Sequence, residues 1–173
     1  MPTSRLLVPF ALIAVLAGCA DDDPARLKVR GAATVALDGT SSGFDFADDV
    51  LLEDDRVGRY DRVAGHCVVS RGATGEPDIL TVGLTVPDSA PVMGEGVRSI
   101  EIRVEGPGVA KVTAMMGETE FTGDAGATCT VTELYRRADE GVAGLEADCE
   151  IADATGRTAQ ASADLHFAGC SVL

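Results

Sequence analysis

Apolar and polar residues alternate along most of this chain, and glycine or proline separates the alternating stretches. A period of two residues is typical of β-strands that bury one face. Near the middle of the chain, for example, Ile100, Ile102 and Val104 fall on one face and charged residues fall on the other. The pattern predicts strands over residues 28–37, 43–52, 59–70, 78–86, 97–105, 109–116, 127–135, 142–151 and 158–167.

Eight or nine short strands with turn signals between them predict an all-β fold. An antiparallel β-sandwich, or a partly closed barrel, is the architecture that such spacing favours. A parallel sheet would need crossover helices, and the best helical candidate, residues 134–144, contains two glycines. We therefore expect a single β domain over residues 28–173.

One hairpin can be placed in register from its cysteines. Residues that face each other in an antiparallel hairpin have residue numbers with a constant sum, so facing Cys129 with Cys149 puts the turn at Asp139, in a polar stretch. The same sum pairs Val131 with Ala147 and Ala127 with Ile151. Facing positions can bring Cα atoms to about 4.5 Å, within disulfide range. The register therefore predicts a bond between Cys129 and Cys149.

The other two cysteines of the domain, Cys67 and Cys170, are then expected to form a second disulfide. It would tie a central strand to the C-terminal end of the chain. Cys170 is out of phase with the apolar residues of the last strand, which a β-bulge at residues 168–169 would correct. Zinc is the competing interpretation, but zinc ligands usually come in close pairs such as C-x2-C, and none is present.

The N-terminal residues have the layout of an export signal, with Arg5 followed by an apolar run of about half the length that spans a bilayer. Leu16-Ala17-Gly18-Cys19 resembles the lipobox of bacterial lipoproteins. The resemblance implies that residues 1–18 are removed and that Cys19 is acylated. We therefore expect an exported lipoprotein anchored to a membrane through Cys19, with residues 19–27 as a short tether. No Asp directly follows Cys19, which favours the outer membrane where the source has one.

Together with the lipobox, two further motifs place a cysteine in a central strand (Gly65–Ser70) and near the C-terminus (Ala168-Gly169-Cys170). With these motifs the chain resembles small bacterial surface lipoproteins, of which the mycobacterial surface-lipoprotein antigens are an example. The expected Cys129–Cys149 bond is additional to that pattern. The resemblance implies a non-enzymatic protein of the cell envelope.

The chain is strongly acidic, with 28 Asp and Glu against 14 Lys and Arg and a net charge of −14. Repulsion from phosphate backbones makes a nucleic-acid partner unexpected. Six carboxylates fall within eleven residues and are weak candidates for binding Ca²⁺, which takes six to eight oxygens: Asp45, Asp48, Asp49, Glu53, Asp54 and Asp55. Three arginines follow at once, at positions 56, 59 and 62. They favour a solvated hairpin partly neutralised by arginine.

The sequence contains few of the residues and motifs that are typical of catalytic sites. The two histidines, His66 and His166, lie in predicted strands, and the sequence has no Gly-x-Ser-x-Gly elbow, phosphate loop, dinucleotide fingerprint or His-Glu-x-x-His motif. A Cys67–Cys170 bond would bring the two imidazoles near each other as a metal or proton site, although solvent-facing histidines are the plainer interpretation. We therefore expect that this protein is not an enzyme and that it binds no cofactor and no metal.

The function expected from the sequence is that of a non-enzymatic binding or structural module held at a membrane. Its partner would be a protein or another envelope component. The alternative is a carrier of an apolar ligand, such as a lipid, in a cavity between the sheets. A core rich in Ala, Val and Gly, which packs loosely, suggests that alternative.

Overall fold

The computed structural model describes residues 26–52, 63–74, 76–86 and 96–173. Within these ranges the regular structure consists of β-strands, and no helix there is long and apolar enough to cross a membrane. The strands are β1 (Lys28–Leu37), β2 (Thr40–Leu51), β3 (Ala64–Ser70), β4 (Ile79–Thr85), β5 (Val97–Gly106), β6 (Val109–Met116), β7 (Thr119–Asp124), β8 (Cys129–Arg137), β9 (Val142–Ala152), β10 (Thr158–Ala168) and β11 (Ser171–Val172).

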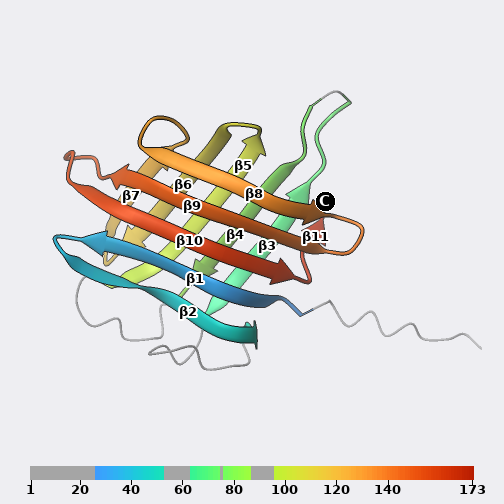
Figure 1. The fold of residues 1–173 in the computed structure, drawn as a ribbon, viewed down its shortest axis with the longest axis horizontal. Helices are drawn as coiled ribbons and strands as arrows, with labels where there is room; N and C mark the ends of the chain where they lie inside the picture. The colour runs from blue at the N-terminus through green and yellow to red at the C-terminus, as the bar shows by residue number, and fades with distance from the viewer. Residues whose placement is uncertain (1–25, 53–62, 75, 87–95) are drawn as a thin grey trace, which may run out of the picture.

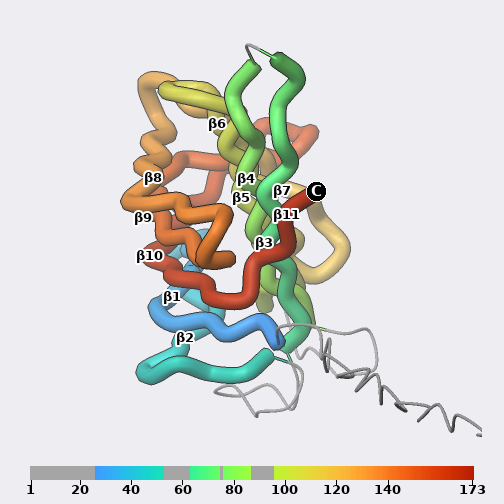
Figure 2. The backbone as a smooth tube through the Cα atoms, turned by 90° about the vertical axis from the view of Figure 1, so that its right-hand side faces the viewer, coloured from blue at the N-terminus to red at the C-terminus, as the bar shows by residue number. Residues whose placement is uncertain are grey.

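The strands form one mixed sheet in the order β11-β3-β4-β5-β6-β7-β9-β10-β1-β2, with β8 also paired to β9. The sheet curls into a half-barrel, so that β8, β9, β10, β1 and β2 face the remaining strands across the core (Figures 1 and 2). A single residue pair, Thr122 with Ala152, joins β7 to β9. The two halves of the sheet therefore form two layers, and the pairing of β7 with β9 that connects them is limited to this residue pair.

The all-β fold is confirmed, but the expectation of eight or nine antiparallel strands is wrong in two places. The sequence of β7 is mostly polar, and Phe121 is its one fully buried side chain. Its alternation of apolar and polar residues is therefore too weak to predict a strand. The short β11 pairs with β3 in parallel, which makes the sheet mixed. β11 is therefore held by pairing with a distant strand, whereas β7 pairs along its length with the adjacent strand β6.

The core lies between the two halves of the sheet, where the inward faces of their strands meet. In β10 every second residue from Ala159 to Phe167 is buried, as the alternation predicts. Phe44 from β2 and Phe121 from β7 are among the largest fully buried side chains. Burying an aromatic or aliphatic side chain of this size stabilises the fold by roughly 1.5–3 kcal/mol. These side chains hold the two layers together.

Both disulfides join the cysteines that the sequence paired. Cys129 on β8 faces Cys149 on β9, and Val131 faces Ala147 as the constant sum requires. However, β8 begins at Cys129, so the expected pairing upstream of that residue is wrong.

The second disulfide, Cys67–Cys170, joins residues 103 positions apart. The chain leaves β10 at Ala168 and turns at Gly169, whose φ is +88°. Cys170 therefore lies beyond β10, and a turn rather than the expected bulge resolves its phase.

The β8–β9 hairpin does contain a bulge, although at a different place. The residue sum is 278 from Cys129 to Glu133 but 279 from Tyr135 onwards, because the register shifts between Glu133 and Tyr135. Leu134 is the extra residue, and it is 41% exposed. The turn therefore spans the four residues 138–141 rather than centring on Asp139.

Candidate functional site

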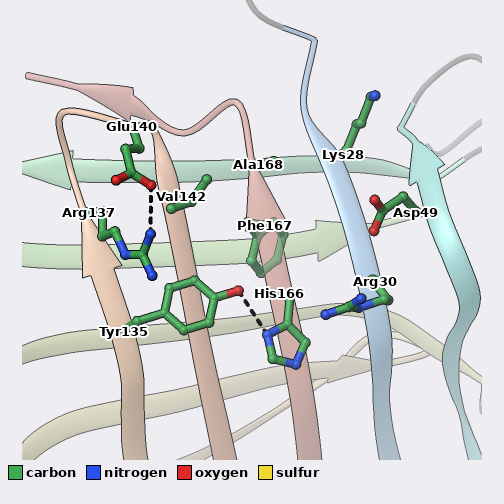
Figure 3. Close-up of a pocket in the computed structure, with 10 residues that line it drawn as sticks. All are labelled: Lys28, Arg30, Asp49, Tyr135, Arg137, Glu140, Val142, His166, Phe167 and Ala168. Atoms are coloured by element: carbon green, nitrogen blue, oxygen red, sulfur yellow. Dashed lines mark hydrogen bonds and ion pairs between the residues drawn. The ribbon is translucent and has the colours of Figure 1, made fainter.

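A shallow hollow of about 320 Å³ lies on the outer face of the half-sheet that contains β8, β9, β10 and β1 (Figure 3). It lies near the start of β1 and the ends of β8 and β10. The polar side chains that define it come from strands far apart in the sequence. They are Lys28, Arg30, Asp49, Tyr135, Arg137 and His166, and Glu140 joins them from the β8–β9 turn.

The register of the sheet places five of these side chains in two neighbouring rows. In one row Arg137, Val142, Ala168 and Lys28 lie side by side across β8, β9, β10 and β1. The next row runs through Tyr135, Gly144, His166 and Arg30 in the same strand order. Because side chains alternate between the faces of a strand, both rows point outward.

The bulge at Leu134 is what puts β8 into these rows. If Leu134 were a regular strand residue and the register did not shift, a constant sum of 278 would face Tyr135 with Ala143, which is fully buried on the inner face. The shift instead faces Tyr135 with Gly144, on the outer face. Arg137 changes face for the same reason. A bulge commonly re-aims side chains in this way.

Gly144 makes room for the two rings on either side of it. A Cβ atom at this position would lie 2.5 Å from a ring carbon of Tyr135 and 3.0 Å from Nδ1 of His166. The two rings instead stack over the glycine, with centroids 5.8 Å apart and planes inclined by 19°. The glycine is therefore part of the site, since a larger residue would separate the rings.

A chain of polar contacts runs from Tyr135 through His166 to Asp164. The Tyr135 hydroxyl lies 2.9 Å from Nδ1 of His166, and Nε2 lies 3.2 Å from Oδ1 of Asp164. The Tyr135 hydroxyl and Nδ1 of His166 share a hydrogen bond, and the tautomer of the imidazole decides which of the two atoms donates. His166 is partly buried, with 24% of its side chain exposed. These contacts fix the orientation of both rings.

The charge of the hollow differs from that of the chain as a whole. Its lining has three fixed cations, Lys28, Arg30 and Arg137, against two carboxylates, Asp49 and Glu140. Arg137 donates through Nη1 to Glu140 at 2.9 Å. The exposed side chains of Lys28 and Arg30 have no hydrogen-bond or ion-pair partner within the described ranges. In a chain with a net charge of −14, this is a local concentration of positive charge.

The rim of the hollow is tied to the nearby disulfide. The carbonyl of Gly141, in the β8–β9 turn, accepts hydrogen bonds from the backbone N–H groups of Gly169 and Cys170 at 2.9 and 2.8 Å. Cys170 is bonded in turn to Cys67 of β3. The turn that follows Arg137 is therefore fastened to the opposite half of the sheet.

Sequence reasoning singled out His166 but not its partners. The alternation of the first strand places Lys28 and Arg30 on its outward face, whereas no local sequence pattern indicates that Tyr135 belongs to the site. The two histidines do not form a shared site. His66, on β3, lies 3.4 Å from Glu101, whereas His166 contacts Tyr135 and Asp164. Each ring covers a glycine of a neighbouring strand, Gly83 and Gly144 respectively.

Only three of the six acidic residues that are weak candidates for binding Ca²⁺ lie within the described ranges. Asp45, Asp48 and Asp49 are exposed on β2, whereas Glu53, Asp54, Asp55 and the arginines that follow lie outside the described residues. No group of three or more His, Cys, Asp or Glu side chains in the described ranges is placed to hold a metal ion. Cys19 and the lipobox also lie outside the described residues.

Asp153, in the turn between β9 and β10, has the clearest electrostatic anomaly of the described chain. The pKa of Asp153 lies below its ordinary value, mainly because the Thr155 hydroxyl donates to the carboxylate at 2.7 Å. The backbone N–H groups of Arg157 and Thr155 and the Arg157 charge lower the pKa further, and burial opposes them. These contacts close the turn, so we interpret Asp153 as a structural residue.

Comparisons with protein-family models, with curated proteins and with solved structures gave no match. The basic hollow is therefore interpreted from its own geometry and charge.

Proposed function

We propose that this chain is an exported bacterial envelope lipoprotein, anchored through Cys19, whose β domain is a non-enzymatic binding module. The observation that carries the proposal is the pair of disulfides, Cys67–Cys170 and Cys129–Cys149. Disulfides persist in oxidising compartments outside the cytosol, and the lipobox-like residues 16–19 supply the matching export signal. In this proposal the basic hollow is the binding face.

Binding rather than catalysis is supported by the form of the hollow. It lies on the open face of a sheet, whereas catalytic groups usually work in sites that exclude water. The Tyr135 hydroxyl is already engaged by His166. We favour this role over the alternative of an apolar carrier, because the hollow opens at the surface and Phe44 and Phe121 are buried in the core between the half-sheets.

The anchor is tested by expressing the full chain in a bacterium and analysing the membrane-extracted protein by mass spectrometry. We expect the N-terminal peptide to begin at Cys19 with a diacylglyceryl group and an acylated amine. Cys19→Ser should remain uncleaved or leave the membrane fraction, whereas the matched variant Asp21→Ser should be processed normally. A mature Cys19→Ser protein that still partitions into detergent would contradict the lipoprotein assignment.

A further inference from the structure

Charge is segregated along the outer face that carries the hollow. Beyond the row of Tyr135 and His166, the next row across β9, β10 and β2 contains Glu146, Asp164 and Asp45, all exposed. Asp148 follows on β9 in the row after that. The cations are therefore confined to one end of an otherwise acidic face.

Two features make this end suited to an anionic ligand. Lys28 and Arg30 from β1 are exposed and have no partner among the described residues. Arg137 from β8 donates a hydrogen bond through Nη1 to Glu140. Its remaining N–H groups are available to a ligand. Figure 3 shows Arg30 and Tyr135 reaching towards His166 from opposite sides. The cations of β1 and of β8 therefore line opposite edges of the hollow, with the Arg30 guanidinium directed towards its middle and the Lys28 amine directed away from it (Figure 3).

We propose that the hollow binds a phosphate-type oxyanion between Arg30 and Lys28 on one side and Arg137 on the other. The proposal deepens the binding role proposed above and rests on it, but does not depend on the anchor. The oxygens of a tetrahedral phosphate point in several directions and can meet donors from two strands, whereas a planar carboxylate is satisfied by one guanidinium fork. Three fixed cations against two carboxylates in the lining match an anion with one negative charge, such as a phosphodiester.

Two sources could supply this group, namely a free phosphate ester or the headgroup of an anionic phospholipid. Residues 20–27 separate Cys19 from Lys28, and eight residues reach at most about 28 Å when extended. A protein anchored at Cys19 would therefore hold the hollow within reach of lipid headgroups.

The test is a nuclear magnetic resonance titration of the full chain with inorganic phosphate, with ionic strength held constant by chloride. We expect saturable shifts of the Arg30, Tyr135 and His166 resonances. Arg30→Gln should weaken binding at least about tenfold, which is the scale of a charge-assisted hydrogen bond. Lys111→Gln, which removes an exposed lysine from β6 in the opposite half-sheet, should leave binding unchanged.

A second arm distinguishes the lipid source. Full-length Cys19→Ser, which lacks the acylation point, is sedimented with vesicles of phosphatidylglycerol or of phosphatidylcholine. Binding to phosphatidylglycerol alone that Arg30→Gln abolishes assigns the site to a headgroup, even where inorganic phosphate does not saturate. If neither phosphate nor phosphatidylglycerol binds, or if Arg30→Gln and Lys111→Gln behave alike, the inference is overturned. The anchor at Cys19 and binding of any other partner would be unaffected by that result.

Discussion

Tyr135 shares a hydrogen bond with His166 across an intervening strand, with its hydroxyl 2.9 Å from Nδ1. The two residues belong to β8 and β10, and β9 lies between them with Gly144 at the crossing point. Three conditions make the contact: a bulge that turns Tyr135 outward, a residue without a side chain between the rings, and a carboxylate that orients the imidazole. Each condition can be changed separately.

Gly144→Val should disrupt this contact and destabilise the domain. The new Cβ would meet the Tyr135 ring at 2.5 Å, so the ring must move and the hydrogen bond to His166 is lost. Overpacking of this kind costs about 1–3 kcal/mol, measurable by urea unfolding. Gly126→Val is the matched control, because the nearest atom to its added Cβ is 3.9 Å away. Equal stability of the two variants would show that Gly144 is not a packing constraint.

Deleting Leu134 should be tolerated, because Leu134 is the extra residue of the bulge. Removal makes the register on either side continuous and leaves Cys129 facing Cys149 and Tyr135 facing Gly144. We expect a loss of less than about 1 kcal/mol, as for exposed positions in general. Deleting Thr132, a regular strand position, should cost more, because one side of the hairpin must slip and turn its side chains to the other face. Thermal unfolding and disulfide mapping of both deletions would check this. A Leu134 deletion that prevents the Cys129–Cys149 bond would contradict the assigned bulge.

The two disulfides should differ in their effect on stability. The chain-entropy relation gives about 4.7 kcal/mol for the loop closed by Cys67–Cys170 and about 3.3 kcal/mol for that closed by Cys129–Cys149, from separations of 103 and 20 residues. Replacing both cysteines of each pair by Ser and measuring chemical unfolding gives the comparison. We expect Cys67→Ser with Cys170→Ser to be the more destabilised variant. The reverse order would show that the long loop is already restricted in the unfolded chain.

Asp153 should make stability depend on pH in the acid range. Its pKa is lowered in the folded protein, so the folded state favours the ionised form. The stabilisation is therefore complete above the ordinary carboxyl pKa and is lost as the pH falls through the lowered value. Asp153→Ala should lower the melting temperature at pH 7, and its difference from the wild type should shrink towards pH 2. Asp153→Asn, which keeps one acceptor oxygen, should lie between them. A difference that is independent of pH would contradict the assigned ionisation.

The sequence predicts those elements whose alternation is unbroken. In β10 the small and large apolar residues follow one another without interruption, and the facing cysteines set the register of β8 and β9. Tyr135 could not be placed because the β8 sequence has no glycine or proline to signal a bulge. A register without a bulge would direct the Tyr135 ring into the core. The curl of the sheet and the parallel pairing of β11 depend on contacts between distant segments, which a local period does not encode.

The position of β1 bears on when this protein can fold. Although β1 is the first strand to be synthesised, it lies between β2 and β10, and β10 is among the last to emerge. The β1–β2 hairpin can form early, but one long edge of β1 stays open until residues 158–168 are available. Such non-local pairing folds slowly. The half-sheet that covers the core is therefore completed only when nearly the whole chain has been synthesised, and until then the inward faces of the earlier hairpins stay uncovered.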